Sequence, residues 1–217
     1  GASLQFDGVN DVVRTVNLPA LTQFTLEAWV RRGADSGTFE TLLSDATSTY
    51  SQATLATFID GGGADCGAGD QFAYYQRAGN QTVCSGVTAT VGTWYHVAVS
   101  RDAAGTFRFF VDGVLRVTRT NFTAPSDSSG TFTLGRAGDY AGEYFGGWLD
   151  EVRISNIAVY TAAFTPPTSR LTASANTVAL WHLDEGAGQT AGDASGNNRA
   201  GTLGTSAAAD SADPAWS

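Results

Sequence analysis

Lysine and methionine are absent from this 217-residue chain, and charged residues of any kind make up only 15% of it. The basic residues are 12 arginines scattered along the sequence, against 21 acidic residues, and the net charge is −9. A partner such as nucleic acid or an anionic membrane would require a local basic patch to overcome this repulsion, and the sequence has none. It also lacks a run of 18 apolar residues, so we expect no membrane span.

Cysteine is scarce as well, with Cys66 and Cys84 as the only two. Both lie in a region rich in glycine and aspartate, and the chain has no Cys and His residues at a metal-binding spacing. We therefore predict a disulfide between them, which would contribute about 3 kcal/mol by closing a short loop. The alternative is two buried free thiols. A disulfide indicates an oxidising compartment, so we expect a secreted, extracellular or cell-surface protein.

Hydrophobic residues recur with a period of two, and helix-forming patterns are rare. In residues 24–31, Phe24, Leu26, Ala28 and Val30 fall on one face, whereas Thr25, Glu27, Trp29 and Arg31 fall on the other. The dipeptide Asp112-Gly113 is typical of a tight hairpin turn. Residues 155–164 offer the best candidate for a short helix. The pattern predicts an all-β fold, a two-sheet antiparallel sandwich.

Several segments together resemble the laminin-G-like, concanavalin A-like jelly-roll superfamily. They are residues 3–8 (SLQFDG), 24–30 (FTLEAWV), 92–99 (GTWYHVAV), 109–113 (FFVDG), 147–154 (GWLDEVRI), 181–186 (WHLDEG) and 193–197 (DASGN). The resemblance covers nearly the whole chain and implies a jelly-roll sandwich. In such domains the segment that resembles residues 181–197 normally comes first, but here it comes last.

The domain organisation follows from this order. We expect a single jelly-roll domain over residues 1–217, with residues 165–177 as an extended linker. Residues 178–217 would provide a terminal strand and a loop. That strand could close the sheet of its own chain, or it could pair with the open sheet edge of a neighbouring copy. The sequence leaves both possibilities open.

The resemblance also implies a structural calcium site. It would use Asp7 and Asp150, and backbone carbonyls near Gly8 or Asn10 would complete the shell. Calcium takes oxygen ligands of both kinds. The alternative is that Asp7 and the nearby Asp11 simply cap a turn, because Asx residues are common in turns.

The sequence does not favour an enzyme. Family relatives that cleave β-glucans carry a Glu-x-Asp-x-x-Glu pattern or a close variant within one strand. No glutamate of this chain is followed by aspartate two residues later, so the paired carboxylates of a glycosidase are missing from one strand. The chain also has no Gly-x-Ser-x-Gly or His-Glu-x-x-His motif.

A cluster of aromatic and acidic residues precedes and enters one predicted strand. Its members are Asp139, Tyr140, Glu143, Tyr144 and Trp148. Aromatic faces stack on sugar rings and carboxylates accept hydrogen bonds from hydroxyl groups, so this cluster is a candidate carbohydrate site. The alternative is that Trp148 and Phe145 belong to the core. We expect Trp29, Trp94 and Trp181 to be core or inter-sheet residues.

We therefore predict a non-catalytic extracellular recognition or adhesion module that binds carbohydrate or a cell-surface glycoconjugate and contains structural calcium. The alternative is a self-assembling subunit of a cell-surface filament or tandem array, in which copies of the chain exchange the terminal strand. The aromatic cluster favours the first hypothesis. The displaced segment at residues 181–186 favours the second.

Overall fold

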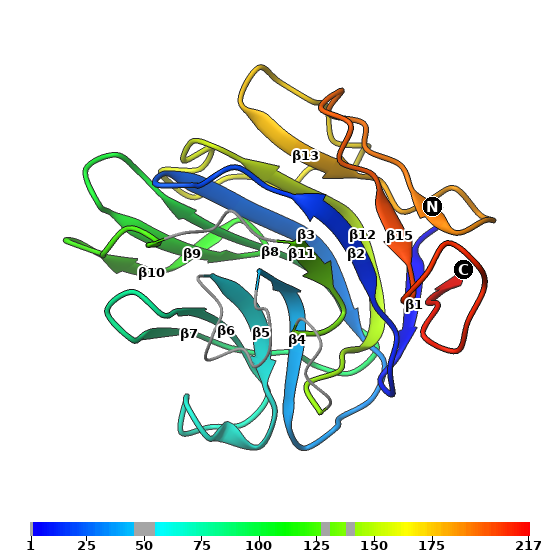
Figure 1. Ribbon diagram of the computed structural model, residues 1–217. Helices are drawn as coiled ribbons and strands as arrows, with labels where there is room; N and C mark the ends of the chain where they lie inside the picture. The colour runs from blue at the N-terminus through cyan, green and yellow to red at the C-terminus, as the bar shows by residue number, and fades with distance from the viewer. Residues whose placement is uncertain (1, 46–54, 127–130, 138–141) are drawn as a thin grey trace.

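Two antiparallel sheets face each other in the computed structural model of the chain, which confirms the predicted jelly-roll sandwich (Figure 1). The structure describes residues 2–45, 55–126, 131–137 and 142–217. Within these ranges there is no α-helix, and residues 155–164 lack the predicted short one. The only helical element described is the 3₁₀ turn η2 (Gly61–Gly63), and no described helix is long and apolar enough to cross a membrane.

Each sheet contains eight of the described strands. Sheet A comprises β1 (Leu4–Asp7), β3 (Phe24–Arg32), β8 (Trp94–Arg101), β9 (Phe107–Val111), β10 (Val114–Arg119), β12 (Gly146–Ser155), β13 (Thr177–Trp181) and β16 (Ala215–Trp216). Sheet B comprises β2 (Val13–Asn17), β4 (Phe39–Ser44), β5 (Ala56–Asp60), β6 (Gln71–Gln76), β7 (Gln81–Thr88), β11 (Thr131–Leu134), β14 (Thr190–Ala191) and β15 (Gly201–Leu203).

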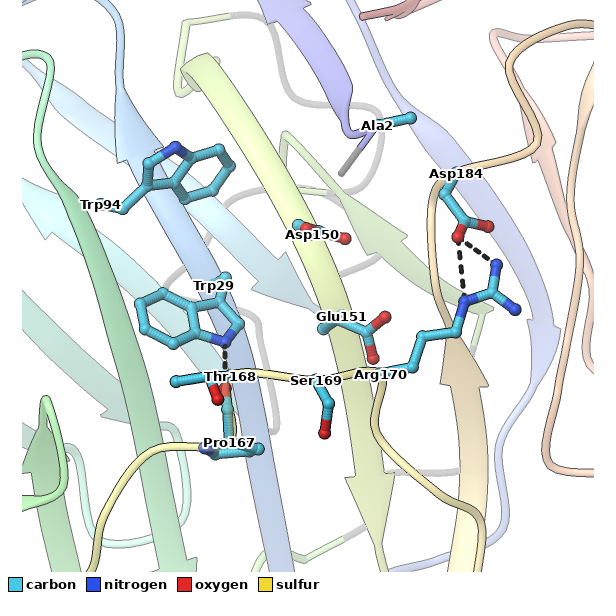
Figure 2. A pocket seen from close by; sticks show the side chains of 10 residues that line it. All are labelled: Ala2, Trp29, Trp94, Asp150, Glu151, Pro167, Thr168, Ser169, Arg170 and Asp184. Carbon is cyan, nitrogen blue, oxygen red and sulfur yellow. Dashed lines mark hydrogen bonds and ion pairs between the residues drawn. The ribbon is translucent and has the colours of Figure 1, made fainter.

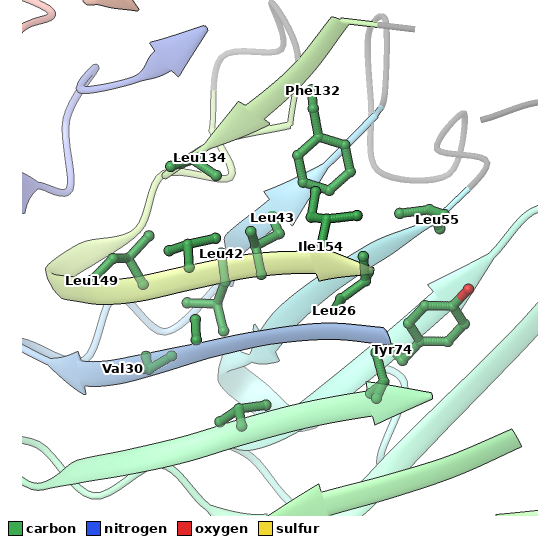
Figure 3. Close-up of a cluster of buried hydrophobic side chains, with 14 of the residues drawn as sticks. Leu26, Val30, Leu42, Leu43, Leu55, Tyr74, Phe132, Leu134, Leu149 and Ile154 are labelled. Carbon is green, nitrogen blue, oxygen red and sulfur yellow. The ribbon is translucent and has the colours of Figure 1, made fainter. Parts of the chain in front are cut away.

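The core lies between the inner faces of the two sheets (Figure 3). The predicted apolar face of β3 is buried there, because side chains alternate between the two faces of a strand. Leu26 and Val30 of β3 lie in one cluster with Leu42 of β4 and Tyr74 of β6. Apolar burial of this kind stabilises the fold by about 25 cal/mol per Å² removed from water.

The hairpin between β9 and β10 has the predicted two-residue turn. Asp112 and Gly113 both have positive φ, at 52° and 70°, which is the backbone geometry of the turn that suits antiparallel strands. A Cβ atom at Gly113 would lie 1.9 Å from the carbonyl oxygen of Phe164. This close approach stabilises the fold. The Phe164 N–H donates a hydrogen bond to the Gly113 carbonyl at 2.9 Å, which holds residues 156–176 against the hairpin. We call residues 156–176, which join β12 to β13, the connection.

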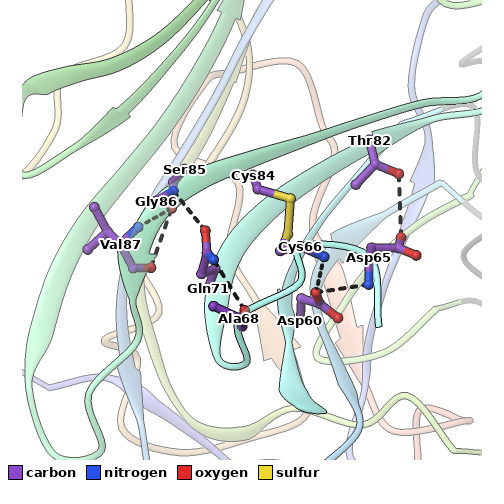
Figure 4. Close-up of a disulfide and its surroundings, with 10 residues drawn as sticks. All are labelled: Asp60, Asp65, Cys66, Ala68, Gln71, Thr82, Cys84, Ser85, Gly86 and Val87. Atoms are coloured by element: carbon purple, nitrogen blue, oxygen red, sulfur yellow. Dashed lines mark hydrogen bonds between the residues drawn. A yellow bond between two sulfur atoms is a disulfide. The ribbon is translucent and has the colours of Figure 1, made fainter. Parts of the chain in front are cut away.

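The predicted disulfide joins Cys66 and Cys84, with Cα atoms 5.7 Å apart (Figure 4). It ties the glycine-rich loop after β5 to β7. The same loop is held by the Asp60 carboxylate, which accepts hydrogen bonds from the N–H groups of Asp65 and Cys66 at 3.1 and 2.6 Å. The prediction of a bridge rather than two free thiols is confirmed.

The terminal segment, residues 178–217, contributes to both sheets of its own chain. β13 pairs with β12, β16 pairs with β1, and β15 pairs with β2. The strand that could have served a neighbour therefore closes its own sandwich in this structure. Exchange of β13 between copies, and the filament built from it, stays a prediction.

Candidate binding site

A pocket of about 570 Å³ opens on the outer face of sheet A, on the side opposite the core (Figure 2). Strands β3, β8 and β12, the connection and the turn after β13 all contribute to it. The lining residues are Ala2, Trp29, Trp94, Asp150, Glu151, Pro167, Thr168, Ser169, Arg170 and Asp184.

Strand register brings the two tryptophans and Asp150 to this face. Trp29 of β3 is paired with Asp150 of β12, and the next outward-facing residue of β3, Arg31, is paired with Trp94 of β8. Their core-facing neighbours Ala28 and Val30 are buried, so alternation directs these side chains outward. Trp29 and Trp94 remain half-buried. Each therefore presents ring surface to the pocket.

A β-bulge places two consecutive carboxylates in the pocket. The register between β12 and β3 shifts between Asp150 and Arg153, and Glu151 has a φ of 51°. A bulge adds one residue to a strand and redirects a side chain that would otherwise face the opposite side. Figure 2 shows Asp150 and Glu151 together on β12. Without the bulge, strict alternation would turn Glu151 toward the core.

Glu151 holds neighbouring elements in place. Its Oε1 lies 2.8 Å from Nδ1 of His182, and its Oε2 accepts a hydrogen bond from the Leu171 N–H at 2.7 Å. These contacts join β12 to the end of the connection and to the residue after β13. Next to Glu151, on the side of the pocket away from the two tryptophans, Arg170 forms an ion pair with Asp184. The pocket wall is thus built by residues distant in sequence.

A buried polar network packs against the indole of Trp29 on the outer face of sheet A. The ring of His96 lies edge-on to Trp29, with centroids 5.4 Å apart, and its Nε2 lies 3.2 Å from Glu27. Glu27 also binds Arg153 and accepts a hydrogen bond from the hydroxyl of Tyr160. On the other side, Nε1 of Trp29 donates to the Pro167 carbonyl at 3.3 Å. The indole is therefore fixed before any ligand arrives.

Burial, followed by the negative charge of Glu151, raises the pKa of Asp150 to about 6. In the unfolded chain an aspartate titrates near about 3.9. Between these values the folded state binds more protons, so the contribution of Asp150 to stability falls as the pH rises from about 4 to about 6. The charge of Asp184 also raises this pKa, whereas the backbone N–H of Glu151 and the charge of the N-terminus act against the increase.

We therefore expect Asp150→Asn to be more stable than the wild-type chain at pH 7–8 and equal to it near pH 4. The gain should be about 1–2 kcal/mol, which allows for the partial exposure of the group. Urea unfolding across this range measures it. The pKa of Asp11 is also raised to about 6. Because Asp11 is present in both proteins, its contribution to the pH dependence of stability cancels in the difference between them. A stability difference that does not change with pH would contradict the expectation.

The predicted aromatic cluster is only partly brought together. Asp139 and Tyr140 lie outside the described residues. Tyr144 is half-buried with the Arg136 guanidinium 5.9 Å from its ring centroid, whereas Glu143 is buried. Trp148 lies on the outer face of sheet A, under the guanidinium of Arg31 at 4.6 Å.

Of this cluster, Trp148 lies nearest in strand position to the pocket, two residues before Asp150 on the same face of β12. It is half-buried and is not a core residue, in contrast to Phe145, which is fully buried in the core. The four other residues of the cluster precede β12. Carbohydrate binding by the cluster stays a prediction.

The structure does not bring the predicted calcium ligands together. Asp7 is paired with Gly146 on β12, four residues before Asp150, and four residues of strand span about 13 Å. One ion with oxygen ligands at about 2.4 Å cannot bridge that distance. Oδ1 of Asp7 instead accepts the N–H groups of Val9 and Asn10, next to the exposed Gly8, as in the turn-capping alternative.

Two of the three tryptophans expected in the core are pocket residues. Trp181 is fully buried, as predicted, but Trp29 and Trp94 face outward, so that part of the prediction was wrong. The signal was present in the alternation, which already put Trp29 on the polar face of its strand with Glu27 and Arg31. No sequence signal pointed to Arg170 or Asp184.

A family model described as the concanavalin A-like lectin/glucanases superfamily matches residues 7–163. No curated protein matches the chain. A candidate carbohydrate binding protein from Bacteroides ovatus has a similar structure, with 18% identity, a TM-score of 0.74, and coverage of 93% of this chain and 57% of the other.

Two further similar structures cover about three quarters of the chain. A heptameric SAP-like pentraxin from Limulus polyphemus has 18% identity and a TM-score of 0.58, covering 74% of this chain and 78% of the other. The CBM40 domain of the Ruminococcus gnavus IT-sialidase, bound to α2,3-sialyllactose, has 16% identity and a TM-score of 0.55, covering 73% and 91%. At these identities the similarity is one of fold.

Proposed function

Because the chain belongs to the concanavalin A-like lectin/glucanases superfamily, we propose that it is a carbohydrate-binding module whose glycan site is the pocket of Trp29 and Trp94. The observation that carries the proposal is the combination of two half-buried tryptophans and three carboxylates in one pocket on the outer face of sheet A. The carbohydrate-binding descriptions of the Bacteroides ovatus protein and the CBM40 domain agree with it.

The chemistry of the pocket suits a sugar. Indole rings offer apolar faces to the C–H groups of a pyranose, and carboxylates accept hydrogen bonds from its hydroxyl groups. The volume of about 570 Å³ falls in the range of about 300–1,000 Å³ typical of small-molecule sites. Because Trp29 is already fixed by His96 and by the Pro167 carbonyl, little ordering is required when a ligand binds.

We propose that the site binds without cleaving. A glycosidase needs one carboxylic acid and one carboxylate that is free to act as nucleophile or base. Glu151 is engaged by His182 and by the Leu171 N–H, and Asp184 is engaged by Arg170. Asp150 is then the pocket carboxylate that no side chain of the lining engages in a hydrogen bond or ion pair, and one such group does not make a catalytic pair. The disulfide supports an extracellular or cell-surface setting.

The proposal predicts that Trp94→Ala weakens glycan binding about five- to thirtyfold. The indole of Trp94 lines the pocket, and loss of one stacking face costs on the order of 1–2 kcal/mol of binding free energy. Screening of the wild-type chain on a glycan array, followed by calorimetry with the best ligand, measures the effect.

Trp216→Ala is the matched control, because Trp216 is also a half-buried tryptophan but lies on β16, outside the pocket. It should bind as the wild-type chain does. Tyr144→Ala tests the aromatic cluster as the alternative location. Loss of binding in Tyr144→Ala with full binding in Trp94→Ala would reject the pocket as the glycan site.

Calcium binding stays a prediction. Among the described residues, no group of three or more His, Cys, Asp or Glu side chains is arranged to hold a metal ion. If calcium stabilises the chain, a chelator should lower the melting temperature. Because one ion cannot bind both carboxylates, Asp7→Ala and Asp150→Ala should differ, and only the variant that removes a ligand should abolish the effect of the chelator. Identical melting curves with and without the chelator would remove calcium from the proposed function.

A further inference from the structure

We propose that the pocket selects sugars that carry a free, protonated amine over their neutral and acidic counterparts. The inference rests on the proposed function, because it names the class of carbohydrate that the same pocket takes. Three features of the pocket carry it: the balance of charge, the position of Asp150 and the two indole rings beside it.

The charge balance of the lining is negative. Asp150, Glu151 and Asp184 are opposed by a single cationic side chain, Arg170. That guanidinium is engaged by Asp184, and its side chain is 61% exposed at the rim. Arg170 also acts on Glu151, but one guanidinium against three carboxylates leaves the side chains of the lining with a net negative charge. Because the lining carries more negative than positive charge, its field attracts cations.

Asp150 is the group that gains most from a cationic ligand. Burial and the neighbouring Glu151 disfavour its ionised form, which is why its pKa is raised. A positive charge placed beside it reverses that effect, because an opposite charge within about 4–6 Å stabilises the carboxylate. An ammonium group also supplies three N–H donors. A neutral hydroxyl supplies one donor and no charge.

The indole rings add a second attraction for the same group. Trp29 is the cross-strand neighbour of Asp150, and Trp94 lines the pocket beside them (Figure 2). The face of an indole attracts a cation within about 6 Å of the ring centroid, and tryptophan is the strongest aromatic partner for this contact. A pyranose ring stacked on either indole would therefore carry an amine substituent into a site that already favours positive charge.

The same observations disfavour the other ligand classes. A metal ion would need converging ligands, and no described group of three or more such side chains is arranged to hold one. A sugar with a carboxylate would add negative charge to a lining that already holds three carboxylates. The sialyllactose bound by the CBM40 domain is such an acidic sugar. We therefore expect the order amine, then neutral, then acidic.

Calorimetry with three matched tetrasaccharides tests the inference. The probes are β-1,4-linked glucosamine, its N-acetylated form and β-1,4-linked glucose. They are titrated at about pH 6.5, which lies above the pKa of about 6 of Asp150 and at which a substantial share of the amine is protonated. The glucosamine probe should bind at least tenfold more tightly than the N-acetylated probe. In Asp150→Asn that preference should disappear, so that the glucosamine and N-acetylated probes bind with equal affinity.

Asp102→Asn is the matched control, because it removes the same charge at a carboxylate that pairs with Arg108, outside the pocket. It should keep the preference for the amine. Loss of the preference in Asp102→Asn, or its survival in Asp150→Asn, would overturn the inference. Ethanolamine, which has the amine without the sugar ring, should not compete at the same concentration. Competition by it would show that any cation suffices and would also overturn the inference.

The outcomes separate this inference from the proposed function. Equal binding of the glucosamine and N-acetylated probes, both lost in Trp94→Ala, would leave the pocket as a glycan site and reject the preference for an amine. Absence of binding for every sugar on the array and for all three probes would reject the proposed function and, with it, this inference.

Discussion

Glu27→Ala is expected to lower the free energy of unfolding by about 3–5 kcal/mol, because it breaks a buried ion pair and leaves the opposite charge without its partner. Glu27 is fully buried on the outer face of β3, beneath the connection. Its Oε1 accepts a hydrogen bond from Arg153 at 2.7 Å, and its Oε2 accepts one from the Tyr160 hydroxyl at 2.7 Å. The fully buried His96 lies 3.2 Å from the same oxygen.

The pH dependence of this effect has a definite sign. Burial alone would raise the pKa of Glu27, but the hydrogen bond from His96 and the charge of Arg153 act against it, and the net pKa is lowered. A carboxyl group with a lowered pKa stabilises the fold above its unfolded pKa of about 4.3, and this contribution is lost as the pH falls through the folded value. The gap between wild type and Glu27→Ala should therefore narrow in acid.

Urea unfolding at pH 7 and at lower pH measures both effects. Glu185→Ala is the control, because this glutamate is exposed and accepts a hydrogen bond from the backbone N–H of Gly192. It should cost less than about 1 kcal/mol. If Glu27→Ala unfolds within 1 kcal/mol of the wild-type chain, the network does not stabilise the fold as inferred.

Trp181→Ala is expected to lower the free energy of unfolding by a similar amount, about 3–5 kcal/mol, because it leaves a large cavity in the core. Trp181 is fully buried on β13 and paired with Val152 of β12. Its indole Nε1 donates to the Arg199 carbonyl at 2.8 Å. The side chain thus joins sheet A to the loop of the terminal segment, and its removal should loosen both.

Trp181→Phe is the matched variant. It retains an aromatic ring but loses the hydrogen bond to Arg199, and it should cost clearly less than the alanine variant. Light scattering on the same samples determines whether β13 serves its own chain. A monomer that is strongly destabilised by Trp181→Ala agrees with the fold described above. A monomer whose stability does not change would show that the terminal segment is not part of the sandwich.

The domain extends beyond the part of the chain that the family model matches. The family model ends at residue 163, but β13, β15 and β16 all follow that point and pair with strands inside it. The pocket depends on this region as well, since Arg170 and Asp184 form one of its walls. We expect the segment after residue 163 to be required for both stability and binding.

Several features of the molecule followed from local sequence alone. Alternation along residues 24–31 identified the buried face of β3, because the backbone of a strand sends successive side chains to opposite faces. Asp112-Gly113 identified a turn, because positive φ at both positions suits this dipeptide. The only two cysteines identified the bridge. Alternation and turn geometry act within a few residues of the chain. The two cysteines had no other cysteine to pair with.

Strand register decides which residues of the pocket, and which of the predicted calcium ligands, lie close together. Local sequence does not specify this register. Asp7 and Asp150 were expected to meet, but the pairing of β1 with β12 separates them by four residues. Trp29 and Asp150 were not expected to meet, yet the pairing of β3 with β12 makes them cross-strand neighbours. The bulge at Glu151 then turns a second carboxylate into the pocket.

The sequence by itself therefore determined the fold class, the core face of the strands, the hairpin and the disulfide. The tertiary structure alone decided which outward-facing side chains share a pocket and which strands of its own chain the terminal segment pairs with. The reason is physical: alternation and turn chemistry are local properties of the backbone, whereas the pocket requires β3, β8, β12 and the connection to arrive at one place. Only the packing of the whole chain places these elements next to one another.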